Sequence, residues 1–265
     1  MHRTRKFYRT RPFRRTRFQF LDVMAGLVPA IHASAFSNPA DRFKSDIVSN
    51  VIPFVLCVDI GGPAKIGWAD LTGRDGTGAN LGDALDRLSQ SLREEKPAAL
   101  GFEAPIWTPV RAELARITGR RGGIETTYNR AWSAGAGCGA LGAALALMPW
   151  CLRRIAKTAG PVATTVDSKR FQERGGLFLW EAFVSGSMKR DGTSHHDDAR
   201  AACLAFAARW PHFVSDIPAE PAMNHAVSSA MAAGLSVDPL ELAFPALVIG
   251  LVDGRDKPGH DAKTM

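Results

Sequence analysis

Three acidic residues occupy positions where a folded chain rarely leaves a carboxylate without help. Asp59 ends the apolar run V-L-C-V-D, Glu103 ends the run A-A-L-G-F-E, and Asp198 begins the stretch D-A-R-A-A-C-L-A-F. A buried carboxylate is costly unless a cation or hydrogen-bond donors satisfy it. If these three acids converge, hard divalent cations are the natural partners of their oxygen atoms, and we expect Mg²⁺ or Mn²⁺ held by Asp59, Glu103 and Asp198.

Carboxylates that hold such a metal pair have a characteristic chemistry. Two ions about 3.5–4 Å apart activate a water molecule and stabilise the leaving oxygen when a phosphodiester is hydrolysed. The three acids therefore favour a metal-dependent nuclease or phosphodiesterase. In this hypothesis they are the catalytic residues and the metal ligands, and the partner is a nucleic acid whose type the sequence leaves open.

The residues that precede Asp198 add further candidates. Apolar residues follow it at helical spacing and form one stripe. The stripe consists of Ala199, Ala202, Cys203, Phe206, Ala207 and Trp210. Asp198 lies about 100° from the centre of this stripe, at the border of the core, whereas Asp197 lies nearly opposite and is better placed as an N-cap or solvent residue. His195 or His196 could serve the leaving group or a substrate phosphate.

A fourth acid and several arginines stay open to two interpretations. Glu181 interrupts the apolar run L-F-L-W-E-A-F-V, either as a further site acid or as an outward-facing residue of an edge strand. A nuclease needs phosphate contacts. Candidates for these contacts are Arg111, Arg116, Arg120, Arg121 and Arg130, although the alternative for such charges is a solvated face.

The elements that must position these residues alternate between strand and helix patterns. Strands are predicted at Val55–Asp59, Ile66–Leu71, Ala98–Glu103, Val162–Val166 and Leu177–Val184. Helices are predicted at 80–94, through Leu141 to Ile155 with a kink expected at Pro149, from Asp198 to Trp210, and at Met223–Gly234, before a last apolar run at Ala243–Val248. The turn Gly61-Gly62-Pro63 joins the first two strands as a hairpin. This order predicts an α/β fold with a mixed sheet flanked by helices.

The ends of the chain differ from its body. The net charge is +7, yet the first twenty residues contain eight Lys or Arg and no acid, so the basicity belongs to the tail. We expect residues 1–50 to be a basic, disordered or spurious extension, with a secretory segment or a nucleic-acid-binding arm as alternatives. The stretches V-M-A-G-L-V-P-A-I-H and R-D-K-P-G-H-D resemble translated intergenic repeats of bacterial genomes. The predicted domain therefore spans 51–248, followed by a disordered tail at 249–265.

The cysteines and the hydropathy indicate a cellular setting. Cys57, Cys138, Cys151 and Cys203 lie far apart without a C-x-x-C pair, which is typical of buried reduced thiols in a cytoplasmic protein. At 46% hydrophobic and 22% charged residues the chain is typical of soluble globular proteins. We expect no membrane span, because no stretch reaches about 18–20 uninterrupted apolar residues.

Four segments in this order resemble a known family. V-D-I-G-G-P-A-K-I-G-W-A, G-F-E-A-P-I-W, N-R-A-W-S-A-G-A-G and H-H-D-D-A-R-A-A together resemble the bacterial and archaeal domain-of-unknown-function family 429, a predicted nuclease family of ribonuclease H-like fold. The resemblance covers roughly residues 53–210. It implies an acidic metal cluster built from the first strand, the fourth strand and the last core helix, which by position are Asp59, Glu103 and Asp198.

Two other function classes remain as alternatives. Sugar kinases and actin-like ATPases hold phosphates with a related strand and turn, but Pro63 stands where their hydroxyl would be and lacks an N–H group. A ribonuclease H-like module that binds nucleic acid or a protein without catalysis is the second alternative. Binding of Mn²⁺, lost in Asp59→Asn, distinguishes the metal-dependent enzyme from this non-catalytic module.

Overall fold

The computed structural model describes residues 51–61, 65–184 and 194–251. The basic segment 1–50, the predicted turn residue Pro63 and the tail from 252 onward lie outside the described residues, as do the interpretations attached to them. The description below concerns the part of the chain that contains all of the candidate site residues.

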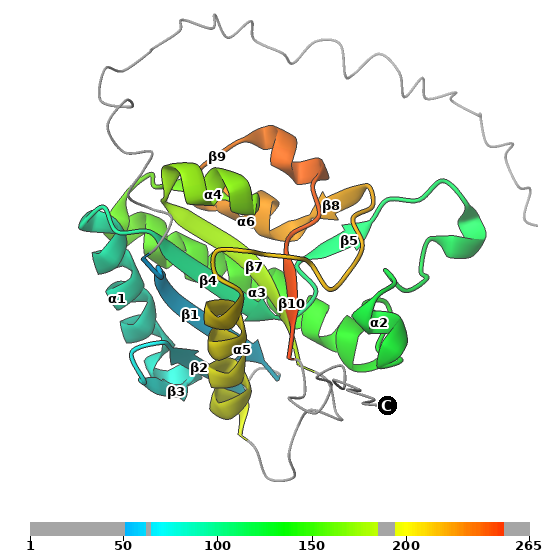
Figure 1. Ribbon diagram of the computed structural model, residues 1–265, viewed down its shortest axis with the longest axis horizontal. Helices are drawn as coiled ribbons and strands as arrows, with labels where there is room; N and C mark the ends of the chain where they lie inside the picture. The colour runs from blue at the N-terminus through cyan, green and yellow to red at the C-terminus, as the bar shows by residue number, and fades with distance from the viewer. Residues whose placement is uncertain (1–50, 62–64, 185–193, 252–265) are drawn as a thin grey trace, which may run out of the picture. The chain divides into compact units, whose positions relative to one another are not determined.

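Strands and helices alternate along the described chain (Figure 1). The strands are β1 (Phe54–Ile60), β2 (Ile66–Asp70), β3 (Asp75–Thr77), β4 (Ala98–Glu103), β5 (Trp107–Pro109), β6 (Ala163–Thr165), β7 (Leu177–Phe183), β8 (Ala222–Asn224), β9 (Ser236–Val237) and β10 (Val248–Gly250). The α-helices are α1 (Leu81–Arg93), α2 (Ile124–Thr127), α3 (Gly135–Ala159), α4 (Ser168–Arg174), α5 (His195–Arg209) and α6 (His225–Ala233). The five predicted strands and four predicted helices are present with small shifts at their ends.

One mixed sheet of eight strands organises the molecule. Its order is β3-β2-β1-β4-β7-β6-β9, and β10 pairs in addition with β7. β1, β4, β7 and their further neighbours are parallel, whereas β2 and β3 continue the sheet as antiparallel hairpins. β5 and β8 form a separate two-stranded antiparallel pair. The predicted α/β class, with a mixed sheet flanked by helices, is therefore confirmed.

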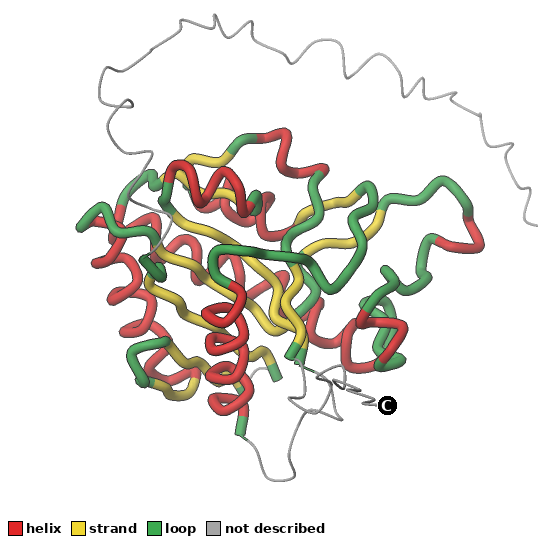
Figure 2. The backbone as a smooth tube through the Cα atoms, viewed as in Figure 1, coloured by secondary structure: helices red, strands yellow, loops and turns green. Residues whose placement is uncertain are grey.

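Helices cover both faces of the sheet (Figure 2). Because successive side chains of a strand point to opposite faces, their alternation decides which residues face which helices. Leu56 and Val58 of β1 point into the core shared with α1, α3 and α6. Val55 and Cys57 point to the other side, into a core shared with α4 and α5. Asp59 continues the second series, so it faces α5.

The C-terminal boundary of the domain lies further along the chain than predicted. β10 pairs Val248 with Glu181, Ile249 with Ala182 and Gly250 with Phe183. The predicted boundary at 248 falls inside this strand. The sequence pattern misses it because a three-residue strand has too few positions to show a period.

Helix α3 corrects the expectation that no segment resembles a membrane span. Its 25 residues run through Pro149, and by length and composition alone it could cross a membrane, with 33% of the relevant window buried in this fold. Its inner side packs against the sheet core through Ala144, Met148 and Leu152. The first half of α3 consists largely of glycine and alanine. Because these residues are only weakly apolar, the sequence pattern does not identify the helix as a long apolar run. Core helices of soluble proteins pass the same test.

The cysteines lie as predicted with one exception. Cys57, Cys151 and Cys203 are buried free thiols, whereas Cys138 is exposed near the start of α3. Burial is the main cause that raises the pKa of Cys57, and the neighbouring Cys203, Glu103 and Asp59 raise it further. The thiol of Cys57, two residues before Asp59 on β1, therefore stays protonated.

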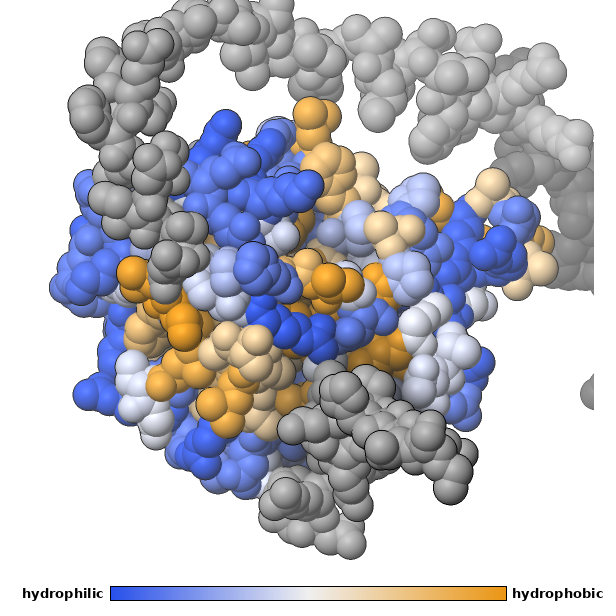
Figure 3. Space-filling view, in the orientation of Figure 1, coloured by the Kyte–Doolittle hydropathy of each residue, from blue (hydrophilic) through white to orange (hydrophobic). Residues whose placement is uncertain are grey.

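The start of α5 is set by a capping box. The side chain of Ser194 accepts a hydrogen bond from the backbone N–H of Asp197, and the Asp197 carboxylate accepts from the Ser194 N–H at 3.0 Å and from its hydroxyl at 2.6 Å. These reciprocal bonds satisfy backbone donors that the first turn leaves unpaired. The surface over the rest of α5, at the front of the molecule, is largely apolar and includes the exposed Leu204 (Figure 3).

Removing the cap should destabilise the protein measurably. We expect Ser194→Ala to lower the free energy of unfolding, measured by chemical denaturation, by about 1 kcal/mol, because an N-cap hydroxyl typically contributes that much stability. Ser228→Ala is the control: its exposed hydroxyl donates to the carbonyl of His225 in the first turn of α6, and its change should stay within about 0.5 kcal/mol. Equal stability of Ser194→Ala and wild type would contradict this description of the helix start.

The same contacts predict how the effect of Ser194→Ala changes with pH. The hydrogen bonds from Ser194 lower the pKa of Asp197 in the folded protein. A carboxylate with a lowered pKa contributes stability above its ordinary pKa and loses it as the pH falls through the folded value. The difference between wild type and Ser194→Ala should therefore be larger at neutral pH than in strong acid.

Candidate metal centre

Asp59 and Glu103 lie at the carboxyl ends of adjacent parallel strands of the sheet. They are register partners, Asp59 on β1 and Glu103 on β4, so both side chains leave the same face. Each residue is only 3% exposed. The sheet topology therefore brings together two of the predicted site acids, and does so in a buried position where two negative charges repel strongly unless cations are near.

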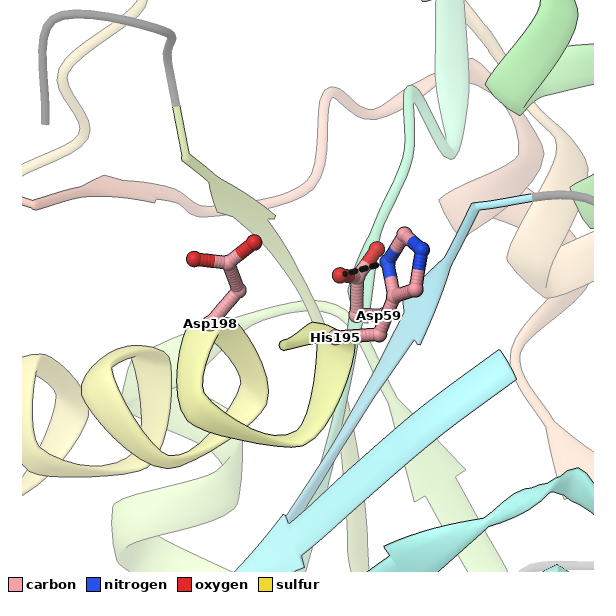
Figure 4. A group of neighbouring side chains, drawn as sticks. All are labelled: Asp59, His195 and Asp198. Carbon is pink, nitrogen blue, oxygen red and sulfur yellow. Dashed lines mark hydrogen bonds and ion pairs between the residues drawn. The ribbon is translucent and has the colours of Figure 1, made fainter. Parts of the chain in front are cut away.

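The first turn of α5 brings two more groups to Asp59. Ligand atoms of Asp59, His195 and Asp198 all lie within 4.8 Å of one another. Figure 4 shows Asp198 and His195 projecting from the start of the helix toward the end of the strand that holds Asp59. Asp198 is 6% exposed, so the border position inferred from helical phase is the one that the side chain occupies.

His195 is bound to Asp59. Its Nδ1 lies 2.7 Å from Oδ2 of Asp59, and its side chain is 35% exposed. With Asp59 ionised, Nδ1 carries the proton of this bond, which leaves Nε2 as the imidazole atom that can bind a metal or exchange a proton. Asp59 thus fixes the tautomer and the orientation of a partly accessible histidine.

Two glycines allow α5 to approach the sheet this closely. A Cβ atom on Gly67 of β2 would lie 2.3 Å from the carbonyl carbon of His195 and 2.4 Å from the nitrogen of His196. A Cβ on Gly61 would lie 2.1 Å from Cε1 of the His195 ring. Real contacts of this length do not occur, so any larger residue would displace the helix start and its histidine.

The neighbours of Asp198 have other roles. Asp197 belongs to the capping box, and its other oxygen faces Arg200 at 3.5 Å. His196 is partly exposed, with Nε2 3.9 Å from the Asp197 carboxylate. Both residues lie beside the group formed by Asp59, His195 and Asp198 without belonging to it.

Arg130 approaches the site from the Glu103 side. Its Nη1 lies 3.8 Å from Oε1 of Glu103, and the same nitrogen donates to the carbonyl of Val184, at the end of β7. Its guanidinium also stacks over the ring of Phe183 at 5.4 Å. The arginine thus places a partly accessible positive charge, with 22% of its side chain exposed, beside the carboxylates.

The remaining arginines proposed as phosphate contacts are engaged elsewhere. Arg111 donates to Glu220 and to three carbonyls of the loop that follows β5. Arg116 pairs with Glu113, and Arg120 donates to Asn129. Arg121 is fully buried between two glutamates. Among the five, Arg130 is therefore the one that lies at the carboxylate cluster.

Glu181 is separated from the cluster by the sheet. It is the register partner of Phe102, whose side chain points to the α1 and α3 side, whereas Glu103 points to the α5 side. Both oxygens of Glu181 accept hydrogen bonds from Arg121, at 2.6 and 2.9 Å. The residue is 1% exposed and belongs to a central strand, so neither the edge-strand interpretation nor direct contact with the cluster fits this position.

Oxygen donors dominate the arrangement. Asp59 and Asp198 offer carboxylate oxygens of the kind that Mg²⁺ and Mn²⁺ prefer, and His195 offers one nitrogen. Glu103, the third predicted ligand, lies in register beside Asp59 but is not one of the three residues whose ligand atoms lie within 4.8 Å of one another. Such a set suits a hard divalent cation better than the thiolate and imidazole sets typical of structural zinc. No family model, no curated protein and no solved structure matches this chain.

The close approach of α5 gives a test of the site geometry. We expect Gly67→Ala to destabilise the protein by about 1–3 kcal/mol, because its Cβ would overlap backbone atoms that cannot rotate away. Gly142→Ala is the matched control, since nothing lies within 4 Å of its Cβ position on α3. The free energy of unfolding of Gly142→Ala should rise by up to about 1 kcal/mol, because alanine has a higher helix propensity than glycine. Chemical denaturation of both variants measures the difference, and a Gly67→Ala protein as stable as wild type would contradict this packing.

Proposed function

We propose that this protein is a divalent-metal-dependent phosphodiesterase that hydrolyses a nucleic-acid backbone. The observation that carries the proposal is the convergence of Asp59, His195 and Asp198 within 4.8 Å, with Glu103 in register beside Asp59. Buried acids placed side by side at the end of a sheet are costly for the fold, and a cation offsets that cost. The ions proposed are Mg²⁺ or Mn²⁺.

We further propose a ribonuclease H-like fold. Support comes from the mixed sheet with helices on both faces and from the origin of the acids in the first strand, the fourth strand and a helix start. This is the arrangement that the resemblance to family 429 implies.

Each residue has a proposed role. Asp59, Glu103 and Asp198 would hold the metal, which would lower the pKa of a bound water and neutralise charge on the phosphate. In its imidazolium form, with the Nδ1–H held by Asp59, His195 would be placed to give its Nε2 proton to the leaving oxygen and would become the neutral Nδ1–H tautomer. Arg130 presents its guanidinium to a phosphate oxygen of the substrate.

Metal binding is the first test. With Mn²⁺ at about 100 times its dissociation constant, the wild-type protein should gain about 2.7 kcal/mol of stability. For a domain of this size this corresponds to a rise in Tm of roughly 5–10 °C. Asp59→Asn and Asp198→Asn should lose this rise. Asp83→Asn, an exposed acid in the first turn of α1, is the control and should keep it.

Hydrolysis is the second measurement on the same proteins. Single- and double-stranded DNA, RNA, a hybrid duplex and a branched substrate should be incubated with Mg²⁺ or Mn²⁺, and at least one should be cut by wild type and Asp83→Asn but not by Asp59→Asn. Binding of nucleic acid without cutting would support the non-catalytic module instead. A protein that neither responds to the metals nor cuts would end the proposal.

A further inference from the structure

Glu181 belongs to a buried charge cluster on the face of the sheet opposite the candidate metal centre. Arg121 donates to Glu181 through both terminal nitrogens and to Glu125 through Nε, at 2.6–2.9 Å. The side chains of all three residues are at most 1% exposed. The guanidinium also lies over the ring of Trp107, with 4.5 Å between Cζ and the ring centroid. Every charged group of the cluster therefore has a fixed position.

The cluster holds the chain that follows Glu103. The backbone N–H of Ile106 donates to Glu181 at 3.1 Å, and the carbonyl of Trp107 accepts from Arg121 at 3.2 Å. Glu103 ends β4 and only two residues, Ala104 and Pro105, separate it from Ile106. The path of the strand end is thus tied to the charges on the far side of the sheet.

The same cluster holds Arg130. The backbone N–H of Arg130 donates to the carbonyl of Glu125 at 3.0 Å, and its guanidinium then reaches back to Glu103 at 3.8 Å. A cavity of about 10 Å³, enough for about one water molecule, is lined by Glu125, Glu181 and Arg130 among others. Two groups of the site, Glu103 and Arg130, are therefore connected to one cluster through short covalent and hydrogen-bonded paths.

Energetics suggest why a charged cluster rather than an apolar one occupies this place. Removing two carboxylates and a guanidinium from water costs several kcal/mol per ion, so apolar residues of the same shape would often serve stability equally well. What apolar side chains would not supply are the directed bonds to the Ile106 N–H and the Trp107 carbonyl. These directed bonds fix the path of the chain that follows β4, and this path begins at Glu103 of the candidate metal centre.

We infer that Glu181 and Arg121 are positioning residues for the candidate metal centre, acting through Glu103 and Arg130 from the opposite face of the sheet. The inference rests on the proposed function, because it assigns the cluster a role at that site. It replaces the interpretation of Glu181 as a fourth site acid: Glu181 would help to position Glu103 and Arg130 without itself binding the metal.

A pair of isosteric variants tests the inference. Glu181→Gln keeps the shape but turns one acceptor atom into a donor, so Arg121 loses one of its bonds, and the Ile106 N–H also loses its bond if the amide nitrogen takes the place of Oε2. Glu241→Gln makes the same change at another buried carboxylate, which accepts from Arg170 and from the Val166 N–H beside β6. The affinity for Mn²⁺ is measured on the full chain by the loss of the electron paramagnetic resonance signal of the free ion, well below both melting temperatures.

We expect Glu181→Gln to bind Mn²⁺ about 10-fold more weakly than wild type, the lower end of what loss of a supporting contact costs a metal site. Glu241→Gln should bind as wild type does, even if it is equally destabilised. Arg121→Lys is a second variant, since lysine keeps the charge but cannot make the paired bonds to Glu181. It should also weaken binding, and it replaces Glu181→Gln in the comparison if that variant does not fold.

The outcomes separate this inference from the proposed function. If wild type binds Mn²⁺, Asp59→Asn does not, and Glu181→Gln binds as wild type, the positioning role is wrong while the metal centre stands. If Glu181→Gln and Glu241→Gln weaken binding equally, the effect is general destabilisation and the positioning role is again wrong. If wild type does not bind Mn²⁺ or Asp59→Asn binds equally well, the proposed function and the positioning role both fail.

Discussion

Two carboxylates on neighbouring parallel strands are the constraint on which the rest of the structure depends. Asp59 and Glu103 are register partners, so their separation is set by the spacing of the strands and cannot relax by sliding. Both are buried, which removes the water that would screen their repulsion. The surrounding fold must supply positive charge and hydrogen-bond donors, and the groups it brings are an imidazole, an arginine and the amino-terminal end of a helix.

Each of those groups depends on a local feature of the chain. Helix α5 can pack closely against the sheet because Gly67 has no Cβ atom, and the side chain of Ser194 caps its first turn. The positive end of the helix dipole then lies near the carboxylates, which adds a modest favourable interaction. Arg130, which follows the short helix α2, lies on the Glu103 side of the two carboxylates. Small residues and caps thus determine the electrostatics of the centre as much as the charged residues do.

The sequence pattern identified a large part of this arrangement, and its failures have physical causes. Asp59 and Glu103 could be recognised because each ends an apolar run, and the burial of Asp198 follows from helical phase. The side on which Glu181 lies could not be recognised. Strand β7 is buried on both faces, so all of its residues are enclosed and no alternation in L-F-L-W-E-A-F shows which way the glutamate points.

Contacts between segments that are distant in the sequence could not be predicted from it either. The bond between His195 and Asp59 joins residues 136 positions apart, and nothing in the local pattern selects His195 over His196. The strands β5, β8 and β10 have three residues each and are defined by their partners rather than by their composition. The burial of Arg121 belongs to the same class, because an arginine in a polar loop has no local signal of enclosure.

The parallel pairing of β10 with the second half of β7 affects the order in which the protein can be completed during synthesis. Asp59 leaves the ribosome early, but the residues that pair with Glu181, Ala182 and Phe183 are Val248, Ile249 and Gly250, near the other end of the chain. Domains form as cooperative units once their sequence is available. A growing chain therefore contains Asp59 and Glu103 before it contains β10, so β7 gains its partner beside Glu181 only after the other strands of the sheet have been synthesised.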